Sequence, residues 1–226
     1  MVLASITFLT EEIRQRDESD GRALLSGASY STIAGRSSLE PPSTESRRLI
    51  SFLRAINVGG HNVRMDRLRE LFEALGLSNV ATFIASGNVI FDSPAKNTRA
   101  LEEEIEGHLR EALGYEVATF IRSASELEDI ASYEPFSTSE LEKEGNSLYV
   151  AFLPAPPDGE AQRRLLASRS EVDDFHVRGR EVYWLCRTKM SESPFSGSLL
   201  EKAVGMPATL RNANTLRRLA AKYPAR

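Results

Sequence analysis

The order of strand-like and helix-like patterns between residues 49 and 121 constrains the fold of this chain most. Apolar runs rich in strand-forming residues alternate with stripes of apolar residues spaced as on one face of a helix. The predicted strands are 49–57, 80–85, 89–91 and 117–121, and the predicted helices are 65–75 and 101–113. This order predicts a ferredoxin-like subdomain, an antiparallel four-stranded sheet with two helices on one face.

The same plan recurs in the second part of the chain. Strands are predicted at 148–153, 172–177 and 181–187, and helices at 158–167, 199–204 and 212–223. The sequence therefore predicts an α+β protein with two ferredoxin-like subdomains, the second lacking a fourth strand and carrying an extra C-terminal helix. The expected boundaries are 47–122 for the first subdomain, 123–146 for a helical linker that opens on a capping box at Ser123 and Glu126, and 147–226 for the second.

Several predicted strands carry apolar residues on both faces, such as Tyr183 beside Trp184. An open antiparallel sheet normally exposes one face to water. We therefore expect the second face of each sheet to be covered, most simply by the other subdomain. Residues 1–46 differ from the rest because Ser, Thr, Gly and Pro dominate from Ser26 onward, and we expect a flexible N-terminal extension there.

Three short motifs lie at the ends of the predicted elements. They are R-x-I-N-V-G-G-x-N at 54–62, T-x-I-x-S-G-N-V-x-F at 82–91 and T-x-R-N-x-x-T at 209–215. In these pieces and in their spacing, over about residues 48–223, the chain resembles the bacterial domain of unknown function 1697 family. The resemblance implies paired ferredoxin-like subdomains and no assigned activity. Residues 1–46 have no counterpart in the family pattern, and 189–198 match it loosely.

The glycine-rich loop at Asn57–Gly60 is a candidate anion site. Consecutive backbone N–H groups in such a turn, followed by a helix N-terminus, attract negative charge. A crossover turn that needs glycine for its geometry explains the same residues. Neither nucleotide-binding glycine pattern is present.

The motif at 209–215 opens the last predicted helix, with Thr209 or Asn212 as its N-cap. Arg211 would then lie beside free N–H groups and could clamp a phosphate or carboxylate. The alternative is capping together with an Arg–carboxylate contact between subdomains. Ser86, Gly87 and Asn88 are interpreted first as a tight hairpin turn in which Gly and Asn adopt positive φ.

Basic residues coincide with these motifs although the net charge is -4. Segment 47–69 contains six arginines and one aspartate, and segment 202–226 contains six basic residues and no acidic one. The leading hypothesis is a small anionic ligand bound between the subdomains. Its expected ligand-binding residues are Arg54, Asn57, Gly59, Gly60, Asn62, Ser86, Asn88, Arg211, Asn212 and Thr215. The alternatives are nucleic-acid binding by the two basic segments and an enzyme of unknown reaction, with catalytic residues unassigned.

Metal, cofactor and membrane functions have little support in the sequence. Cys186 is the only cysteine, the three histidines lack zinc spacing, and no cofactor motif occurs, so no metal and no cofactor are expected. Glu171, Asp173, Asp174 and His176 could hold a hard cation, but a polar strand explains them better. No apolar run is long enough to cross a bilayer, and we expect a cytoplasmic protein whose oligomeric state the sequence does not indicate.

Overall fold

The computed structural model describes residues 46–56 and 62–225. The expected N-terminal extension, apart from Ser46, and the predicted loop residues Asn57, Gly59 and Gly60 lie outside the described residues. Within the described part, no helix combines the length and the apolar character that a membrane span requires.

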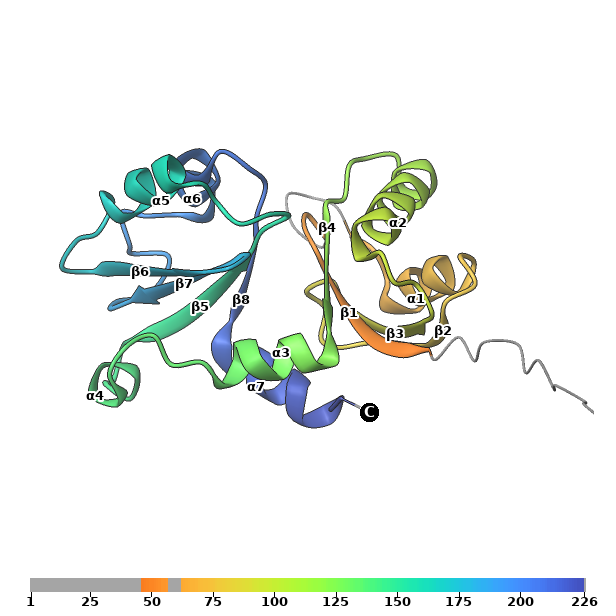
Figure 1. Cartoon of the computed structure of the whole chain (residues 1–226), viewed down its shortest axis with the longest axis horizontal. Helices are drawn as coiled ribbons and strands as arrows, with labels where there is room; N and C mark the ends of the chain where they lie inside the picture. The colour runs from red at the N-terminus through yellow and green to blue at the C-terminus, as the bar shows by residue number, and fades with distance from the viewer. Residues whose placement is uncertain (1–45, 57–61, 226) are drawn as a thin grey trace, which may run out of the picture. The chain divides into compact units, whose positions relative to one another are not determined.

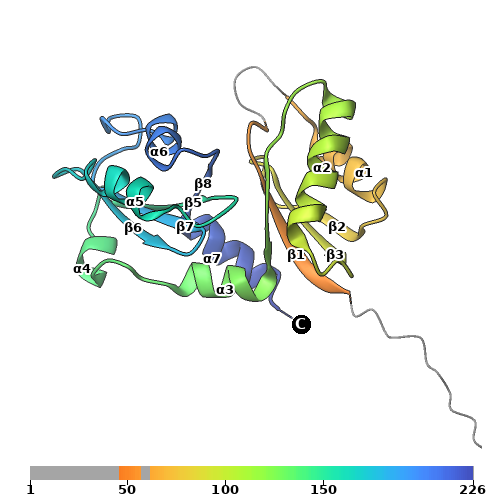
Figure 2. The same ribbon diagram turned by 45° about the horizontal axis from the view of Figure 1, so that its top comes forward.

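The first sheet contains four antiparallel strands in the order β2-β3-β1-β4, and we call it the N-terminal sheet. Two helices, α1 and α2, lie together on one side of it (Figures 1 and 2). The elements are β1 (Arg47–Leu53), α1 (Met65–Glu73), β2 (Ser78–Thr82), β3 (Asn88–Ser93), α2 (Thr98–Leu113) and β4 (Thr119–Ser123). Asn97 caps the start of α2 through its side chain, and Gly114 ends the helix at a φ of 80°.

A helical connection follows the first sheet. α3 (Ala124–Ser132) begins at the capping box that the sequence predicts, with reciprocal hydrogen bonds between Ser123 and Glu126. A single turn, α4 (Thr138–Leu141), precedes the next strand. The capping box fixes where β4 ends and α3 begins, because it satisfies two backbone N–H groups at that point.

The second sheet is also antiparallel, in the order β6-β7-β5-β8, and we call it the C-terminal sheet. Helices α5 and α6 lie on one side of it (Figure 1). The elements are β5 (Ser147–Phe152), α5 (Gly159–Leu166), β6 (Asp173–Arg178), β7 (Glu181–Cys186), α6 (Gly197–Val204), β8 (Thr209–Asn212) and α7 (Ala213–Lys222). The sequence prediction missed β8, since only one of its four residues is a large apolar one. This part of the chain therefore repeats the full strand-helix order of the first and then adds α7.

Three apolar cores hold these layers together. The outer two join each sheet to its own helices, α1 and α2 in one case and α5 and α6 in the other. The third core combines the remaining faces of both sheets with α3 and α7, and in it the rings of Phe52 and Phe152 stack with centroids 3.9 Å apart. The expectation that the second face of each sheet is covered is confirmed, with α3 and α7 sharing that role with the opposite sheet.

The turn between β2 and β3 differs from its predicted form. Gly87 adopts a φ of 71°, as expected, but the other positive φ in the turn belongs to Ile84, at 51°, and Asn88 is the first residue of β3. Asn88 is nearly fully buried and donates to the carbonyl of Phe83, which closes the turn from inside. A β-branched residue with positive φ is strained, so tertiary contacts override local preference here.

Candidate functional site

Arg211 lies at the point where the second and third motifs meet. It belongs to β8, and its side chain reaches the end of β1 and the β2–β3 turn. The guanidinium makes five hydrogen bonds, which matches its five N–H donors. The acceptors are Asn88 Oδ1 at 2.6 Å, Thr209 Oγ1 and the Leu210 carbonyl at 2.8 Å, the Leu53 carbonyl at 3.0 Å and the Gly87 carbonyl at 3.3 Å.

Every acceptor around Arg211 is neutral. Within the described residues, no carboxylate lies within the 4.0 Å that defines an ion pair with it. Burial lowers the pKa of the Arg211 guanidinium from 12.5 to about 10, so the group stays charged at neutral pH. That lowering corresponds to roughly 3 kcal/mol of unfavourable free energy for the charged form. Among residues 46–56 and 62–225, the positive charge at this corner is therefore uncompensated.

Arg122 occupies the equivalent position in the N-terminal sheet. It lies on β4, the strand that corresponds to β8, directly before the residue that caps the next helix: Ser123 caps α3, as Asn212 caps α7. Arg122 lies over the ring of Phe152 at 5.4 Å, and Arg211 lies over the ring of Phe52 at 5.8 Å. Each arginine thus packs on one member of the Phe52–Phe152 stack.

Four hydrogen bonds of each arginine also correspond, and Arg211 has a fifth, to Thr209 Oγ1. Each arginine donates to two backbone carbonyls in or next to strands: that of the preceding residue, and that at the end of the first strand of the other sheet. Each also donates to a carbonyl in a hairpin turn of the other sheet and to the side chain of the first residue after that turn. For Arg122 these acceptors are Ile121 O at 2.8 Å, Leu153 O at 3.1 Å, Arg180 O at 3.4 Å and Glu181 Oε1 at 2.6 Å. For Arg211 they are Leu210 O, Leu53 O, Gly87 O and Asn88 Oδ1.

The two corners differ in one chemical respect. Arg122 pairs with the Glu181 carboxylate, whereas Arg211 meets the neutral amide of Asn88 at the equivalent position. A buried guanidinium is normally neutralised by a carboxylate, because an unpaired buried charge is unfavourable. The Arg122 guanidinium is thus paired with a carboxylate, whereas that of Arg211 has no carboxylate partner in the part of the chain that the structure describes.

The structure unites some of the predicted site residues. Asn88 and Arg211 are in direct contact, and Ser86 joins them because its hydroxyl accepts from the Asn88 amide at 2.9 Å. Asn212 caps α7, as one alternative expected, and Thr215 is half-buried in the first turn of that helix. Two expectations are wrong: Arg211 lies on a strand instead of beside free helix N–H groups, and the carboxylate contact of the alternative interpretation is absent among the described residues.

Arg54 and Asn62 are placed differently from this group. Arg54 follows β1 and forms a two-pronged ion pair with Glu201 of α6, at 2.7 and 3.1 Å. Its charge is therefore matched within the protein. Asn62 is exposed just before α1.

The two basic segments have different electrostatic environments. In 47–69 most arginines form ion pairs, namely Arg48–Asp92, Arg54–Glu201, Arg64–Asp66, Arg67–Glu70 and Arg69–Glu73. In α7, by contrast, Arg217, Arg218 and Lys222 are exposed and have no carboxylate within ion-pair distance among the described residues. Most of the positive charge of segment 47–69 is therefore matched, and the unpaired positive charge of the described residues is concentrated in the C-terminal segment.

Sequence reasoning missed Phe83, which links the α7 cations to this corner. Arg218 and Lys222 each lie 5.7 Å from the centroid of its ring, and its backbone pairs with Asn88. Sequence reasoning also missed the Arg122–Glu181 pair. A signal was present, because the similar tripeptides Arg-Ser-Ala at 122–124 and Arg-Asn-Ala at 211–213 span the ends of corresponding strands.

Strained backbone marks the same region. Ala55, just after β1, has a φ of 63°, and Ile84, in the turn before Asn88, has a φ of 51° with 46% of its surface exposed. Both residues lie within family-like motifs, and strain of this kind concentrates at binding sites. Among the described residues, no group of three or more His, Cys, Asp or Glu side chains is arranged to hold a metal ion.

The fold and the site define a class, an α+β protein of two antiparallel four-stranded sheets with helices on each, joined at a buried arginine corner. Its family follows from comparison: the family model for a protein of unknown function, DUF1697, matches residues 47–183, and the chain belongs to this family. A solved structure of a conserved bacterial protein from Streptococcus pneumoniae is similar in fold, with a TM-score of 0.61 and 20% identity, over 79% of this chain and 98% of that one. The comparison with curated proteins gives no match.

Proposed function

We propose that the protein binds a small anionic ligand, bearing phosphate or carboxylate, at the Arg211 corner between its two sheets. One observation carries the proposal: Asn88 stands where the equivalent corner has Glu181, which leaves the buried charge of Arg211 without a carboxylate partner within the described residues. A bound anion would supply the missing negative charge. Because every Arg211 N–H is already used, the ligand would act on it through the electrostatic field.

The magnitude of this effect is sufficient for selectivity. At an effective dielectric constant of about 20, an anion about 7 Å from a guanidinium gains roughly 2 kcal/mol. That corresponds to about a thirtyfold gain in affinity over a neutral analogue. Direct contacts would come from the Ser86 hydroxyl and from Arg218 and Lys222, which lie over Phe83 in the same turn.

The proposal is tested by thermal unfolding with added phosphate, sulfate or citrate against sodium chloride at equal ionic strength. We expect the multivalent anions to raise the melting temperature of the natural protein. Asn88→Asp would supply the negative charge internally and should remove this response. The double change Arg218→Ala and Lys222→Ala should reduce it, whereas Arg163→Ala, an exposed arginine on α5, should not.

Two results would refute the proposal. One is an equal effect of chloride and multivalent anions on the natural protein, and the other is an undiminished response in folded Asn88→Asp and in the α7 double variant. Native mass spectrometry of the purified protein, searching for a retained small anion, provides an independent measurement.

Nucleic-acid binding remains the second candidate, because the exposed cations of α7 have no carboxylate partners among the described residues. Each phosphate contact releases counterions, so this function predicts affinity that falls steeply with salt. A gel-shift panel of single- and double-stranded RNA and DNA without salt-sensitive binding would remove it. We further propose a cytoplasmic location. We also propose a ferredoxin-like fold for each subdomain, 47–122 and 147–226, and the strand orders β2-β3-β1-β4 and β6-β7-β5-β8 support this assignment.

A further inference from the structure

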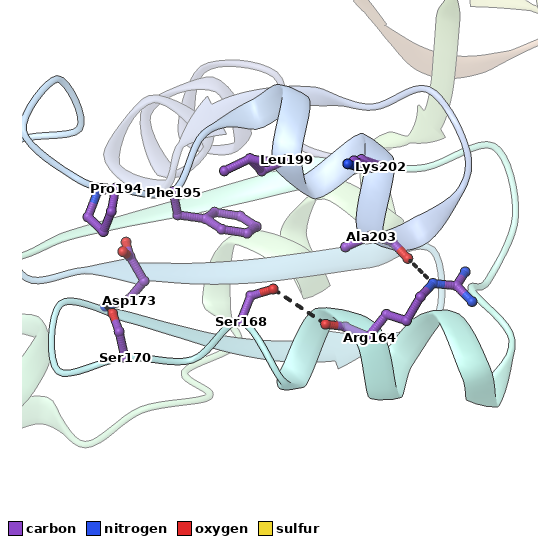
Figure 3. A pocket seen from close by; sticks show the side chains of 9 residues that line it. All are labelled: Arg164, Ser168, Ser170, Asp173, Pro194, Phe195, Leu199, Lys202 and Ala203. Atoms are coloured by element: carbon purple, nitrogen blue, oxygen red, sulfur yellow. Dashed lines mark hydrogen bonds between the residues drawn. The ribbon is translucent and has the colours of Figure 1, made fainter.

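A pocket separate from the Arg211 corner lies between α5 and α6, over the β6 edge of the C-terminal sheet (Figure 3). Its volume is about 430 Å³, within the range of small-molecule sites. Phe195, Leu199, Pro194 and Ala203 give it apolar walls. Among the described residues, Leu199 and Ile84 are the two exposed large hydrophobic residues, and 42% of the Leu199 surface is accessible to solvent.

Asp173, the first residue of β6, supplies the negative charge of this pocket. Its side chain is almost fully buried and projects toward the space beside Pro194 and Phe195 (Figure 3). Trp184 Nε1 donates to Oδ1 at 2.7 Å, and the Ser193 hydroxyl lies 2.9 Å from Oδ1 and 2.8 Å from Oδ2. A carboxylate has about four acceptor positions, so these neutral donors leave it able to accept more.

No cation neutralises Asp173 within the described residues, where every ion pair at 4.0 Å or less involves other carboxylates. Arg164 lines the pocket, but its guanidinium donates to the Ala203 carbonyl (Figure 3). It also donates to Glu160. Lys202 is exposed on α6 and lines the pocket on the side away from Asp173 (Figure 3). The pocket is therefore negative at Asp173, apolar along its walls and positive at the exposed Lys202.

We infer that this pocket binds a small organic ammonium compound, with one primary amine on an apolar body. The ammonium would donate to the Asp173 carboxylate, and the body would pack against Phe195 and Leu199. The aromatic face of Phe195 adds attraction for a cation. Lys202 sets the preference at the far end of the ligand: a second ammonium there is repelled, and a neutral or anionic end is accepted.

The test uses Trp184, which is the single tryptophan and contacts Asp173, as a fluorescent reporter. 2-Phenylethylamine is titrated beside 2-phenylethanol and 3-phenylpropionate, which have similar bodies without the ammonium. We expect saturable binding of the amine, at least tenfold tighter than of the alcohol, and no binding of the carboxylate. Putrescine, a diamine, should bind more weakly than butylamine.

Variants locate the binding in this pocket. Asp173→Asn keeps an acceptor for Trp184 and Ser193 while removing the charge, and we expect at least a tenfold loss of amine affinity. Asp174→Asn is the matched control, because this neighbour pairs with Arg169 and does not line the pocket. Lys202→Glu, an exposed change that should not affect folding, should strengthen amine binding several-fold.

The inference is overturned if the amine and the alcohol bind alike, or if neither binds. It also fails if folded Asp173→Asn retains the affinity of the natural protein. If Asp173→Asn does not fold, Lys202→Glu provides the test instead. An unchanged amine affinity in Lys202→Glu would then contradict the inference. These outcomes are independent of the Arg211 corner, whose variants are not used here.

Discussion

The Arg122 corner allows a quantitative test of the electrostatic reasoning. In Glu181→Gln the amide oxygen can still accept from Arg122, so the change removes charge while conserving shape and one hydrogen bond. The Arg122 side chain is 1% exposed and that of Glu181 is 12% exposed, and their ion-pair atoms are 2.6 Å apart. Burial lowers the pKa of Arg122, and Glu181 opposes that lowering, so the carboxylate favours the charged guanidinium.

The expected loss follows from the charge separation. Two unit charges about 4 Å apart attract by about 4 kcal/mol at an effective dielectric constant of about 20. Removing one partner of a buried pair usually costs about 3–5 kcal/mol. Because glutamine conserves a hydrogen bond and the natural glutamate is slightly exposed, we expect Glu181→Gln to lower the free energy of unfolding by about 2–4 kcal/mol.

Urea unfolding followed by far-ultraviolet circular dichroism measures this loss. With a denaturant slope of about 2 kcal/mol/M, the midpoint should fall by about 1–2 M. Glu171→Gln, an exposed glutamate before β6, serves as control and should change stability by less than about 0.5 kcal/mol. A Glu181→Gln loss no larger than that of the control would show that the carboxylate is not needed by Arg122. The variant should also gain more stability from added phosphate than the natural protein.

Three further changes test other parts of the structure. Gly87→Ala should destabilise by about 2–3 kcal/mol, because φ is 71° and a Cβ would lie 3.1 Å from the Cβ atoms of Leu53 and Ile56; a neutral result in urea titration would refute the assigned turn. Phe52→Ala should cost about 3–5 kcal/mol by removing the stack with Phe152, which calorimetry would detect, and a loss below about 1 kcal/mol would contradict its core role. Burial raises the pKa of Glu102 above 4.5, so its stabilising contribution is complete below that pH and is lost as pH rises through the folded pKa. Glu102→Gln, whose amide oxygen can still accept from the Ile121 N–H, should therefore gain stability relative to the natural protein between pH 4 and pH 7; an unchanged difference across that range would contradict this account.

Local patterns in the sequence determined most of the secondary structure. Apolar periodicity places the helices and most strands, and short-range chemistry fixes several ends, such as the Ser123–Glu126 box and the glycine after α6. These features depend on residues within a few positions of each other. For that reason a single sequence is enough to predict them.

β8 escaped prediction because its stability comes from pairing with β5 along Tyr149–Phe152. Its own residues, Thr209–Asn212, resemble the start of a helix because Asn212 does cap α7. The positive φ of Ile84 was equally invisible, since local preference opposes it. For β8 the deciding contacts, those with β5, lie far away along the chain.

The sequence by itself determined the order of most helices and strands and indicated which short motifs are candidates for a functional site. Only the tertiary structure decided which charges are matched. Apart from Thr209 and Leu210, the acceptors of Arg211 lie 123 to 158 residues away along the chain, and those of Arg122 lie up to 59 residues away. Electrostatic compensation acts through space over a few ångströms, so sequence clusters of arginine do not reveal it. The same reason explains why segment 47–69 is largely neutralised while Arg211 remains without a carboxylate in the described part of the chain.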